Sequence, residues 1–318
     1  MRADALSEGF RARFTAAVER VSATSLTAGR ACLHRFFLLY VAKVGEDDAS
    51  FSGPGFDRPV FGAMIHDMLE QAVREPDASP AELARAAVER REDALTDPAV
   101  RAWALTDLER IARLFRLRET EAAPGGYAPM VRDLEWRFGR GGAEVRLGAG
   151  DGIFHLQGAV DRLDVDDPAR PRHAIVVDYK TSVTGASGGS KSLLDTEDLQ
   201  LPLYAAAIEG LRGVRVVGVE HYTAARRGRW SVGSEIAAGA LKLRAETGKA
   251  KILEESDFRA VLEKALRAAS AVVAAVRRGE HAKAPLDRDA CTRCSVRPVC
   301  RADPSLYRAR RDDPEGDA

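Results

Sequence analysis

The amino-acid sequence predicts an α/β protein in which a mixed central β-sheet is flanked by helices. Apolar residues recur at helical spacing through most of residues 1–121. From Val131 the spacing changes to the alternation of a β-strand, and residues 174–180, AIVVDYK, form an apolar run typical of a strand buried on both faces. Helical spacing returns over residues 258–276. Helices before and after one group of strands favour a single domain over residues 1–318.

The composition is that of an ordinary soluble protein, with 45% hydrophobic and 30% charged residues. Lys+Arg and Asp+Glu both number 48, so a nucleic-acid enzyme would need its basic residues gathered locally. No apolar run approaches the roughly 20 residues of a membrane span, and the N-terminus lacks a signal-peptide pattern, so we expect a cytoplasmic location. There, the four cysteines are more typical of metal ligands or incidental thiols than of disulfides.

Two helices are predicted in the first 75 residues. A capping signal at Ser22–Ser25 opens a helix that should contain Cys32, and a second helix is predicted from Val60, with His66 at the border of its apolar stripe. Taken singly, Cys32 is typical of a small core residue and His66 of a structural histidine. Their importance depends on what the rest of the chain offers.

Residues 77–121 are predicted to form a helical insertion of two helices that separate at Asp97-Pro98. Arg and Glu alternate along the exposed faces of these helices. This pattern favours a solvated, salt-bridged surface, and a lid facing DNA is the alternative.

Residues 131–223 are expected to form the sheet core that carries the active site. Residues 139–144, GRGGAE, predict a hairpin-like turn. The parity of the apolar residues changes beside Asp161, which indicates a bulge or bend that re-aims this side chain. The acidic residues 164–167 are interpreted as an ordinary loop.

Asp178 and Lys180 should project to one face of their strand and Tyr179 to the other, because successive side chains alternate. Together with Asp161, this arrangement offers two carboxylates to a divalent cation and places an ammonium beside it. The hypothesis is a metal-dependent phosphodiesterase centre. Gln200 and Tyr204 lie four residues apart on the following predicted helix and should reach the same side of it.

Two polar stretches invite other interpretations. Residues 182–192 nearly match a phosphate-binding loop, but Ser190 stands where the second glycine is required, and we interpret the stretch as a flexible polar loop. Arg226–Arg229 form a basic patch followed by Trp230. A surface hairpin is favoured there, and contact with phosphates is the alternative.

The cysteines form a spaced set. Cys291, Cys294 and Cys300, joined by the distant Cys32, meet the four-thiolate requirement of an iron–sulfur cluster or a structural zinc ion. Zinc sites usually take two pairs of ligands, so a single N-terminal cysteine is less typical of zinc. Residues 291–300 would then tie the N-terminal helix to the C-terminal region. The charged residues 308–318 are expected to be disordered.

The sequence resembles PD-(D/E)XK nucleases of the RecB-like group, especially the branch with an iron–sulfur cluster that includes AddB and CRISPR adaptation nucleases. The matching pieces occur in the family's order over nearly the full length: the Cys32 helix, Gly62-xxx-His66, Gly158-Ala-Val-Asp161-Arg162, Asp178-Tyr179-Lys180, Gln200-xxx-Tyr204 and Cys291-xx-Cys294-xxxxx-Cys300. Each piece is weak alone, but six in order are specific. Asp178 stands where many members have Glu, which the family allows, and Leu33 follows Cys32 where Pro is common.

The resemblance implies a restriction-endonuclease-like core and a metal-dependent DNA nuclease. We expect an exonuclease that acts on single-stranded DNA ends in repair, recombination or foreign-DNA processing. Its implied metal ligands for Mg²⁺ or Mn²⁺ are His66, Asp161, Asp178 and the Tyr179 carbonyl. Lys180 would orient the water or stabilise the oxyanion, and Gln200 and Tyr204 would position Lys180 or the DNA backbone; with Asp161 and Asp178 these make the catalytic set.

The resemblance also assigns the four cysteines to a [4Fe–4S] cluster, with structural zinc as the alternative. No Walker motif occurs in the sequence, so a helicase would have to be a separately encoded partner. The alternative function is a non-catalytic DNA-binding or scaffold subunit of a helicase–nuclease assembly. The intact Asp161, Asp178 and Lys180 favour the enzyme, because a scaffold does not need them.

Overall fold

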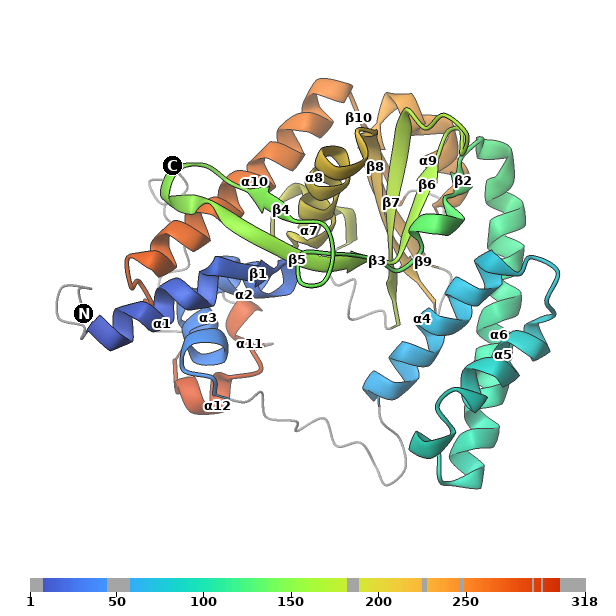
Figure 1. The fold of residues 1–318 in the computed structure, drawn as a ribbon, viewed down its shortest axis with the longest axis horizontal. Helices are drawn as coiled ribbons and strands as arrows, with labels where there is room; N and C mark the ends of the chain where they lie inside the picture. The colour runs from blue at the N-terminus through green and yellow to red at the C-terminus, as the bar shows by residue number, and fades with distance from the viewer. Residues whose placement is uncertain are drawn as a thin grey trace.

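The structure, a computed structural model, describes residues 8–44, 58–181, 189–224, 228–245, 249–287, 289–292 and 294–303. Two β-sheets with helices around them make up the fold (Figure 1). The six-stranded sheet has the order β10-β9-β8-β7-β6-β2, and its strands are β2 (Ala128–Pro129), β6 (Arg162–Val165), β7 (His173–Lys180), β8 (Arg215–Thr223), β9 (Gly228–Ser234) and β10 (Ala250–Leu253). Among the described residues, no helix is long and apolar enough to cross a membrane.

The second sheet has three short strands gathered around one longer strand. They are β1 (Arg20–Ser22), β3 (Trp136–Phe138), β4 (Val145–Leu147) and β5 (Phe154–Val160). β5 pairs in parallel with β1 and antiparallel with both β3 and β4. The expected α/β class with a mixed sheet is therefore confirmed.

Strand β7 is the centre of the larger sheet, as its continuous apolar run predicted. It pairs antiparallel with β6 and in parallel with β8, and its residues from Ala174 to Tyr179 are buried. Its side chains alternate between two hydrophobic cores: Ala174 and Val176 belong to one, and Ile175, Val177 and Tyr179 to the other. A strand covered on both faces loses nearly all contact with water, which explains the unbroken apolar run.

Helices from both ends of the chain cover one face of the six-stranded sheet and the smaller sheet. They are α1 (Glu8–Glu19), α2 (Ala23–Ala31), α8 (Gln200–Arg212) and α10 (Glu255–Arg277). Shorter elements accompany them: α3 (Leu33–Phe36), the π-helical turn Phe37–Val41, α7 (Gly189–Leu194), α11 (Asp289–Thr292) and α12 (Arg297–Cys300). Pro202 lies in the first turn of α8, where a missing backbone N–H costs nothing.

The other face of the larger sheet is covered by α4 (Arg58–Arg74), α5 (Pro80–Glu89), α6 (Pro98–Ala122) and α9 (Ala238–Arg244). The predicted separation at Asp97-Pro98 is present: Asp97 caps α6 by accepting hydrogen bonds from the backbone N–H groups of Ala99 and Val100. The surface of α6 carries close ion pairs such as Arg110–Asp107, as the alternation of charges favoured.

The chain bends at Asp161, where the change in parity predicted a bend. β5 ends at Val160 and β6 begins at Arg162, so the chain passes from the smaller sheet into the larger one at this residue. The backbone N–H of Ser25 bonds the Ser22 hydroxyl, which confirms the predicted cap of α2. Both predictions rested on signals within a few residues of each other.

Four local predictions were wrong in whole or in part. Residues 139–144 do not close a hairpin, because β3 and β4 both pair with β5, end to end. A Cβ atom at Gly139 would lie 2.7 Å from Cα of Gln157, which shows how closely the turn lies against β5. Cys32 interrupts the predicted helix with an extended backbone (φ −165°, ψ 122°), and the freed carbonyl of Ala31 accepts a hydrogen bond from the N–H of Leu286.

The acidic stretch 164–167 is not all loop, since Asp164 belongs to β6 and is fully buried. Its burial is possible because two arginines pair with it, as described below. Residues 189–194 form helix α7 in place of part of the predicted polar loop, while residues 182–188 lie outside the described residues. The predicted disordered residues 308–318 also lie outside them.

Candidate active site

The two candidate carboxylates meet where two strands end. Asp161 follows β5 at the bend, and Asp178 lies near the end of β7, with 7% and 4% of their surfaces exposed. Asp161 Oδ2 accepts a hydrogen bond of 2.5 Å from the backbone N–H of Tyr179. This bond joins the bend to β7 and holds the Asp161 carboxylate beside the face that carries Asp178.

Asp178, Lys180 and Gln200 form a closed hydrogen-bonded group. Lys180 Nζ lies 2.8 Å from Asp178 Oδ2 and donates to Gln200 Oε1 at 2.7 Å, while Gln200 Nε2 donates to Asp178 Oδ1 at 2.6 Å. The predicted shared face of Asp178 and Lys180 is thus observed. Gln200, the first residue of α8, fixes the ammonium and the carboxylate together.

Histidine His66 projects from α4 toward Asp161. Its Nδ1 lies 3.6 Å from Asp161 Oδ1 and 3.4 Å from Glu135 Oε1. Burial lowers the pKa of His66, but hydrogen bonding with Asp161 and Glu135 outweighs this and raises it to about 10. For Asp161, burial raises the pKa to about 6, with the nearby Asp178 charge adding to the effect.

Glu135 is a residue that the sequence analysis missed. Among the described residues, His66, Glu135 and Asp161 form the group of three potential ligands whose donor atoms all lie within 4.8 Å of one another. Glu135 has a positive φ of 49°, which is uncommon for a residue with a Cβ atom. Its backbone N–H bonds the carbonyl of Asp161 at 3.0 Å. The strand pattern of Leu134 and Trp136 made Glu135 look like an outward-facing residue.

The chemistry of this group suits a divalent cation. Carboxylate oxygens and an imidazole nitrogen are ligands that Mg²⁺ or Mn²⁺ accept. Glu135 Oε1 is buried, and the group that faces it, His66 Nδ1, lies 3.4 Å away at the edge of hydrogen-bond distance, so this oxygen is only weakly paired. Burial first, and the nearby Asp178 and Glu135 carboxylates second, raise the pKa of Asp161, and a bound cation would offset both effects.

Tyr204 explains a glycine of the motif around Asp161. A Cβ atom at Gly158 would lie 2.8 Å from the Tyr204 hydroxyl, so only glycine leaves room for this ring. Burial raises the pKa of Tyr204 to about 12, and the hydroxyl keeps its proton at neutral pH. Tyr179 behaves differently: its side chain turns to the opposite face, where its ring lies against Phe115 and Tyr222.

A histidine behind Asp178 was also missed. His221 on β8 is paired in register with Asp178, is 1% exposed, and lies between two carboxylates. Its Nδ1 is 3.1 Å from Asp178 Oδ2 and its Nε2 is 3.1 Å from Asp198 Oδ2. Burial lowers the pKa of His221, but the hydrogen bonds with both carboxylates raise it to about 9. No local sequence signal connects these three residues.

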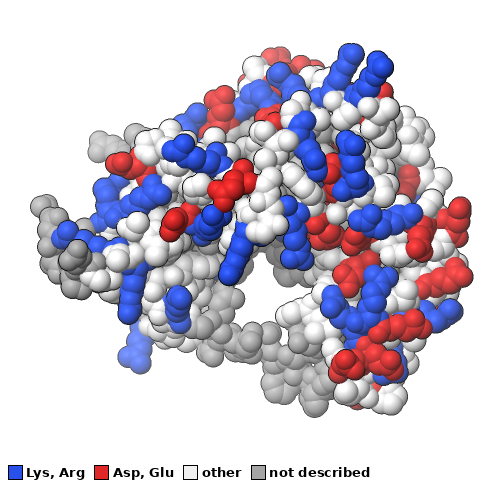
Figure 2. All heavy atoms as spheres, in the orientation of Figure 1, with Lys and Arg blue, Asp and Glu red and all other residues white. Residues whose placement is uncertain are grey.

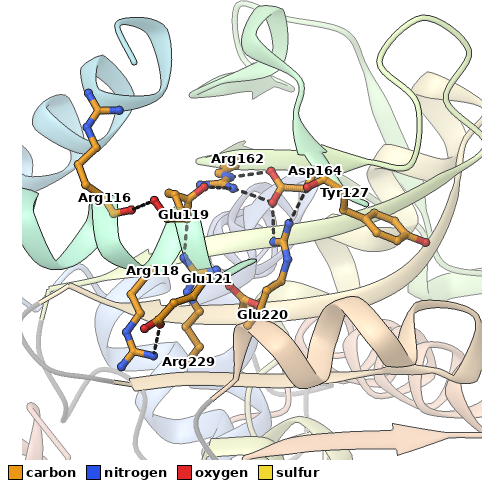
Figure 3. Close-up of polar contacts among 11 residues, drawn as sticks. Arg116, Arg118, Glu119, Glu121, Tyr127, Arg162, Asp164, Glu220 and Arg229 are labelled. Atoms are coloured by element: carbon orange, nitrogen blue, oxygen red, sulfur yellow. Dashed lines mark hydrogen bonds and ion pairs between the residues drawn. The ribbon is translucent and has the colours of Figure 1, made fainter. Parts of the chain in front are cut away.

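A buried ion-pair network occupies the opposite face of the same strands, beneath α6 (Figure 3). Its members are Glu119, Arg162, Asp164, Glu220, Arg229 and Arg244. Arg229 is 4% exposed, so its predicted place in a basic surface patch was wrong; it pairs with Glu119 and Glu220. Arg226 and Arg227 lie outside the described residues.

The four cysteines come together at the opposite end of the molecule from α6. Cys32, Cys291, Cys294 and Cys300 line one small cavity between α3 and the C-terminal segment. Burial raises the pKa of the Cys291 thiol, and the neighbouring thiols add to the rise. Cys32 at the break between α2 and α3 therefore faces the spaced C-terminal cysteines, as the pattern of four predicted.

Comparison with known families agrees with this site. The family model described as PD-(D/E)XK nuclease superfamily matches residues 20–301, and the chain belongs to this superfamily. Membership supports a hydrolytic nuclease with a divalent metal ion and DNA as substrate. The search of curated proteins found no match.

One solved structure, titled "Crystal structure of SSO0001", is similar at 11% sequence identity. The alignment covers 74% of this chain and 84% of that chain, with a TM-score of 0.27. The family assignment therefore rests on the family match and on the topology of the two sheets.

Proposed function

We propose that this protein is a metal-dependent deoxyribonuclease of the RecB-like branch, an exonuclease acting on single-stranded DNA ends. One observation carries the catalytic part of the proposal: Asp161, Asp178, Lys180 and His66, distant in sequence, converge on one group of buried polar side chains. In a purely structural site we would expect close charge pairs, whereas the buried Glu135 oxygen has only the His66 nitrogen at 3.4 Å.

His66, Glu135 and Asp161 are the proposed first ligands, and Asp178 with the Tyr179 carbonyl would complete the set. A bound Mg²⁺ or Mn²⁺ would lower the pKa of a water molecule and neutralise charge on the scissile phosphate. The chain's own contribution is the position of Lys180. Its ammonium has three N–H donors, and Asp178 and Gln200 account for two of them.

Within the described ranges no third acceptor contacts Lys180 Nζ, and its remaining N–H is available to the substrate. It can orient the attacking water or bind the phosphate oxygen on which charge develops. Burial lowers the pKa of Lys180, but the adjacent Asp178 carboxylate outweighs this and raises it, so the amine is charged at neutral pH. Tyr204 and Gln200 keep this geometry by their contacts with the motif around Asp161 and with Lys180.

The surface is consistent with a nucleic-acid substrate. On the face shown in Figure 2, Lys and Arg side chains border the hollow between the α4–α6 helices and the rest of the molecule. The end of β7 reaches this hollow (Figure 1). A chain with equal numbers of basic and acidic residues must concentrate its basic side chains locally to bind phosphates.

We propose a [4Fe–4S] cluster for the cysteine cavity. The four thiols that line this cavity meet the ligand requirement of such a cluster, and structural zinc is the alternative. A single N-terminal cysteine joined to three C-terminal ones is less typical of zinc, which usually takes two pairs of ligands.

The remaining parts of the proposal rest on the resemblance to RecB-like nucleases. By this resemblance, residues 1–318 form a single nuclease domain in which residues 77–121 are a helical insertion. The protein would act in repair, recombination or foreign-DNA processing, with a separately encoded helicase as a possible class of partner. Cytoplasmic location stays a prediction of the sequence. The alternative, a non-catalytic scaffold, would account for the fold but gives no reason for the catalytic side chains to converge.

The test uses end-labelled single- and double-stranded DNA with Mg²⁺ or Mn²⁺. The wild-type protein should shorten single-stranded DNA from its ends, and Asp178→Ala should lower the rate at least 10²–10³-fold. Asp151→Ala, which changes an exposed carboxylate, is the matched control and should cleave as the wild type does. A lack of metal-dependent cleavage, or equal rates for the two variants, would overturn the nuclease proposal and leave the scaffold function.

A further inference from the structure

The cysteine cavity contains two basic residues beside its four thiols. Its lining includes Cys32, Cys291, Cys294 and Cys300 together with Arg35 and Lys283, and none of the described carboxylates lines it. The other lining residues are small or apolar. The described lining therefore has a positive charge and no carboxylate to balance it.

Arg35 has the more unusual environment of the two. It lies on α3, three residues after Cys32, so both residues come to the same side of this short turn. Its Nε atom is buried and has no hydrogen-bond partner. Within the described ranges, no carboxylate is paired with Arg35. The Arg35 side chain is only partly buried, but its buried Nε is a donor without a partner in the described ranges, and a bound anion would supply the missing acceptor.

Lys283 adds a second positive charge from the C-terminal segment. Its Nζ donates to the backbone carbonyl of Cys300 at 3.0 Å. This contact holds the ammonium next to the loop that carries three of the thiols. The two cations thus approach the cavity from both of the segments that the cysteines connect.

The thiols supply the missing negative charge once they bind a metal group. Cysteine ligates as the thiolate, and four thiolates exceed the positive charge of a Zn²⁺ ion or of an oxidised [4Fe–4S] core. The bound group is therefore an anion, and reduction by one electron makes it more negative. A nearby guanidinium stabilises the reduced form more than the oxidised form.

We propose that Arg35 is a positioning residue for the thiolate-bound cluster, which it stabilises by charge and whose reduction potential it raises. This inference rests on the iron–sulfur part of the proposed function. Arg35 does not contact the His66 group, so its effect on the cluster is separable from DNA cleavage. Lys283 plays a lesser part, because a carbonyl already accepts one of its donors.

The experiment reconstitutes the full chain anaerobically with ferrous iron and sulfide. Arg35→Gln removes the charge and keeps most of the side chain, Arg35→Lys keeps the charge, and Arg13→Gln alters an exposed arginine on α1 as the control. Iron, zinc and acid-labile sulfide per chain are measured first. A redox titration followed by absorbance and electron paramagnetic resonance then gives the reduced-to-oxidised ratio at fixed potentials.

At a fixed solution potential, Arg35→Gln should lower the reduced-to-oxidised ratio about tenfold, or ~59 mV for a one-electron couple. It should also lose iron to a chelator several-fold faster. Arg35→Lys should stay close to the wild type, and Arg13→Gln should match it. If Arg35→Gln loads no cluster, a melting curve of the apoprotein equal to that of the wild type would still support the role.

Two outcomes count against the inference in different ways. A wild-type protein that holds iron and sulfide, with a ratio unchanged in Arg35→Gln, would overturn the role of Arg35 and leave the nuclease proposal intact. A wild-type protein that takes up only zinc would overturn the cluster and this inference together. The cleavage assay with Asp178→Ala distinguishes both results from a failure of the nuclease proposal.

Discussion

The two faces of the larger sheet carry two clusters of charge that differ in how fully they are paired. Neighbouring residues of one strand belong to different clusters because strand side chains alternate between the two faces. On β8, His221 contacts the candidate site and Glu220 belongs to the buried ion-pair network. The chain does the same at the bend, where Asp161 faces the site and Arg162 the network. One stretch of backbone therefore supplies two environments.

The ion-pair network is balanced and tight. Three arginines face three carboxylates, and the pairs are 2.5–3.2 Å apart. At the site, by contrast, His66 lies 3.4 Å from Glu135 and 3.6 Å from Asp161, and four carboxylates face one lysine and two histidines. The difference indicates which cluster is structural: every carboxylate of the network has an arginine within 3.2 Å, whereas the longer contacts of His66 leave carboxylate oxygens for a cation.

The largest expected effect breaks the network. Asp164→Asn removes the carboxylate that Arg162 and Arg244 share and leaves two buried guanidinium groups without full charge partners. The free energy of unfolding should fall by about 3–5 kcal/mol. Urea unfolding measures this, with Asp167→Asn in the exposed turn as the control. The cleavage rate per folded molecule should stay within a few-fold of the wild-type rate. A thousandfold loss would show that the network is needed for catalysis and that the two clusters are not independent.

The next effect is the pH dependence of Glu119. Burial raises the pKa of Glu119, but the charges of Arg162 and Arg229 outweigh it and lower the pKa from 4.5 to about 2. A carboxyl with a lowered folded-state pKa stabilises the protein above its unfolded pKa, and this contribution is lost as the pH falls from about 4.5 toward 2. Because 24% of the side chain is exposed, solvent weakens the interaction, and about 2 kcal/mol is expected.

Unfolding by urea at pH 5 and pH 3 measures this contribution. Glu119→Gln should lose less stability between the two pH values than the wild type does. Glu121→Gln, on the same helix and half-exposed, is the control and should follow the wild type. Equal slopes for Glu119→Gln and the wild type would show that the network does not depend on this charge.

The smallest effect sharpens the site. Glu135→Gln removes one charge from the His66 group and should weaken Mn²⁺ binding at least about tenfold, as measured by calorimetric titration. Stability should be unchanged or slightly higher, because the crowding of carboxylates around Asp161 is relieved. Glu75→Gln, at an exposed residue directly after α4, is the control. An unaltered Mn²⁺ affinity would show that Glu135 is not a ligand and would leave His66, Asp161 and Asp178 as the proposed side-chain ligands.

Much of the fold could be predicted because its signals are local. Ser22 and Asp97 cap helices through hydrogen bonds that span two or three residues. Alternation along β7 placed Asp178 and Lys180 together, and the change in parity marked the bend at Asp161. These outcomes depend on backbone geometry over a single turn or strand, and the sequence contains that information directly.

Other features depend on which strands lie next to each other. Residues 139–144 pass along β5 instead of closing a hairpin, and Arg229 is buried because α6 brings Glu119 over β9. His221 reaches Asp178 only through the register of β7 with β8. None of these pairings leaves a periodic trace in the sequence.

The sequence by itself determined the helices, the central strand, the shared face of Asp178 and Lys180, and the spacing of the cysteines. The tertiary structure alone decided that Glu135 joins His66 and Asp161, that Arg162 leaves the site for the opposite face, and that Arg35 lies in the cysteine cavity. The physical reason is the distance along the sequence over which each interaction acts. Periodicity and capping act over a few residues, whereas the pairing of buried charges depends on contacts between segments that only the folded chain brings together.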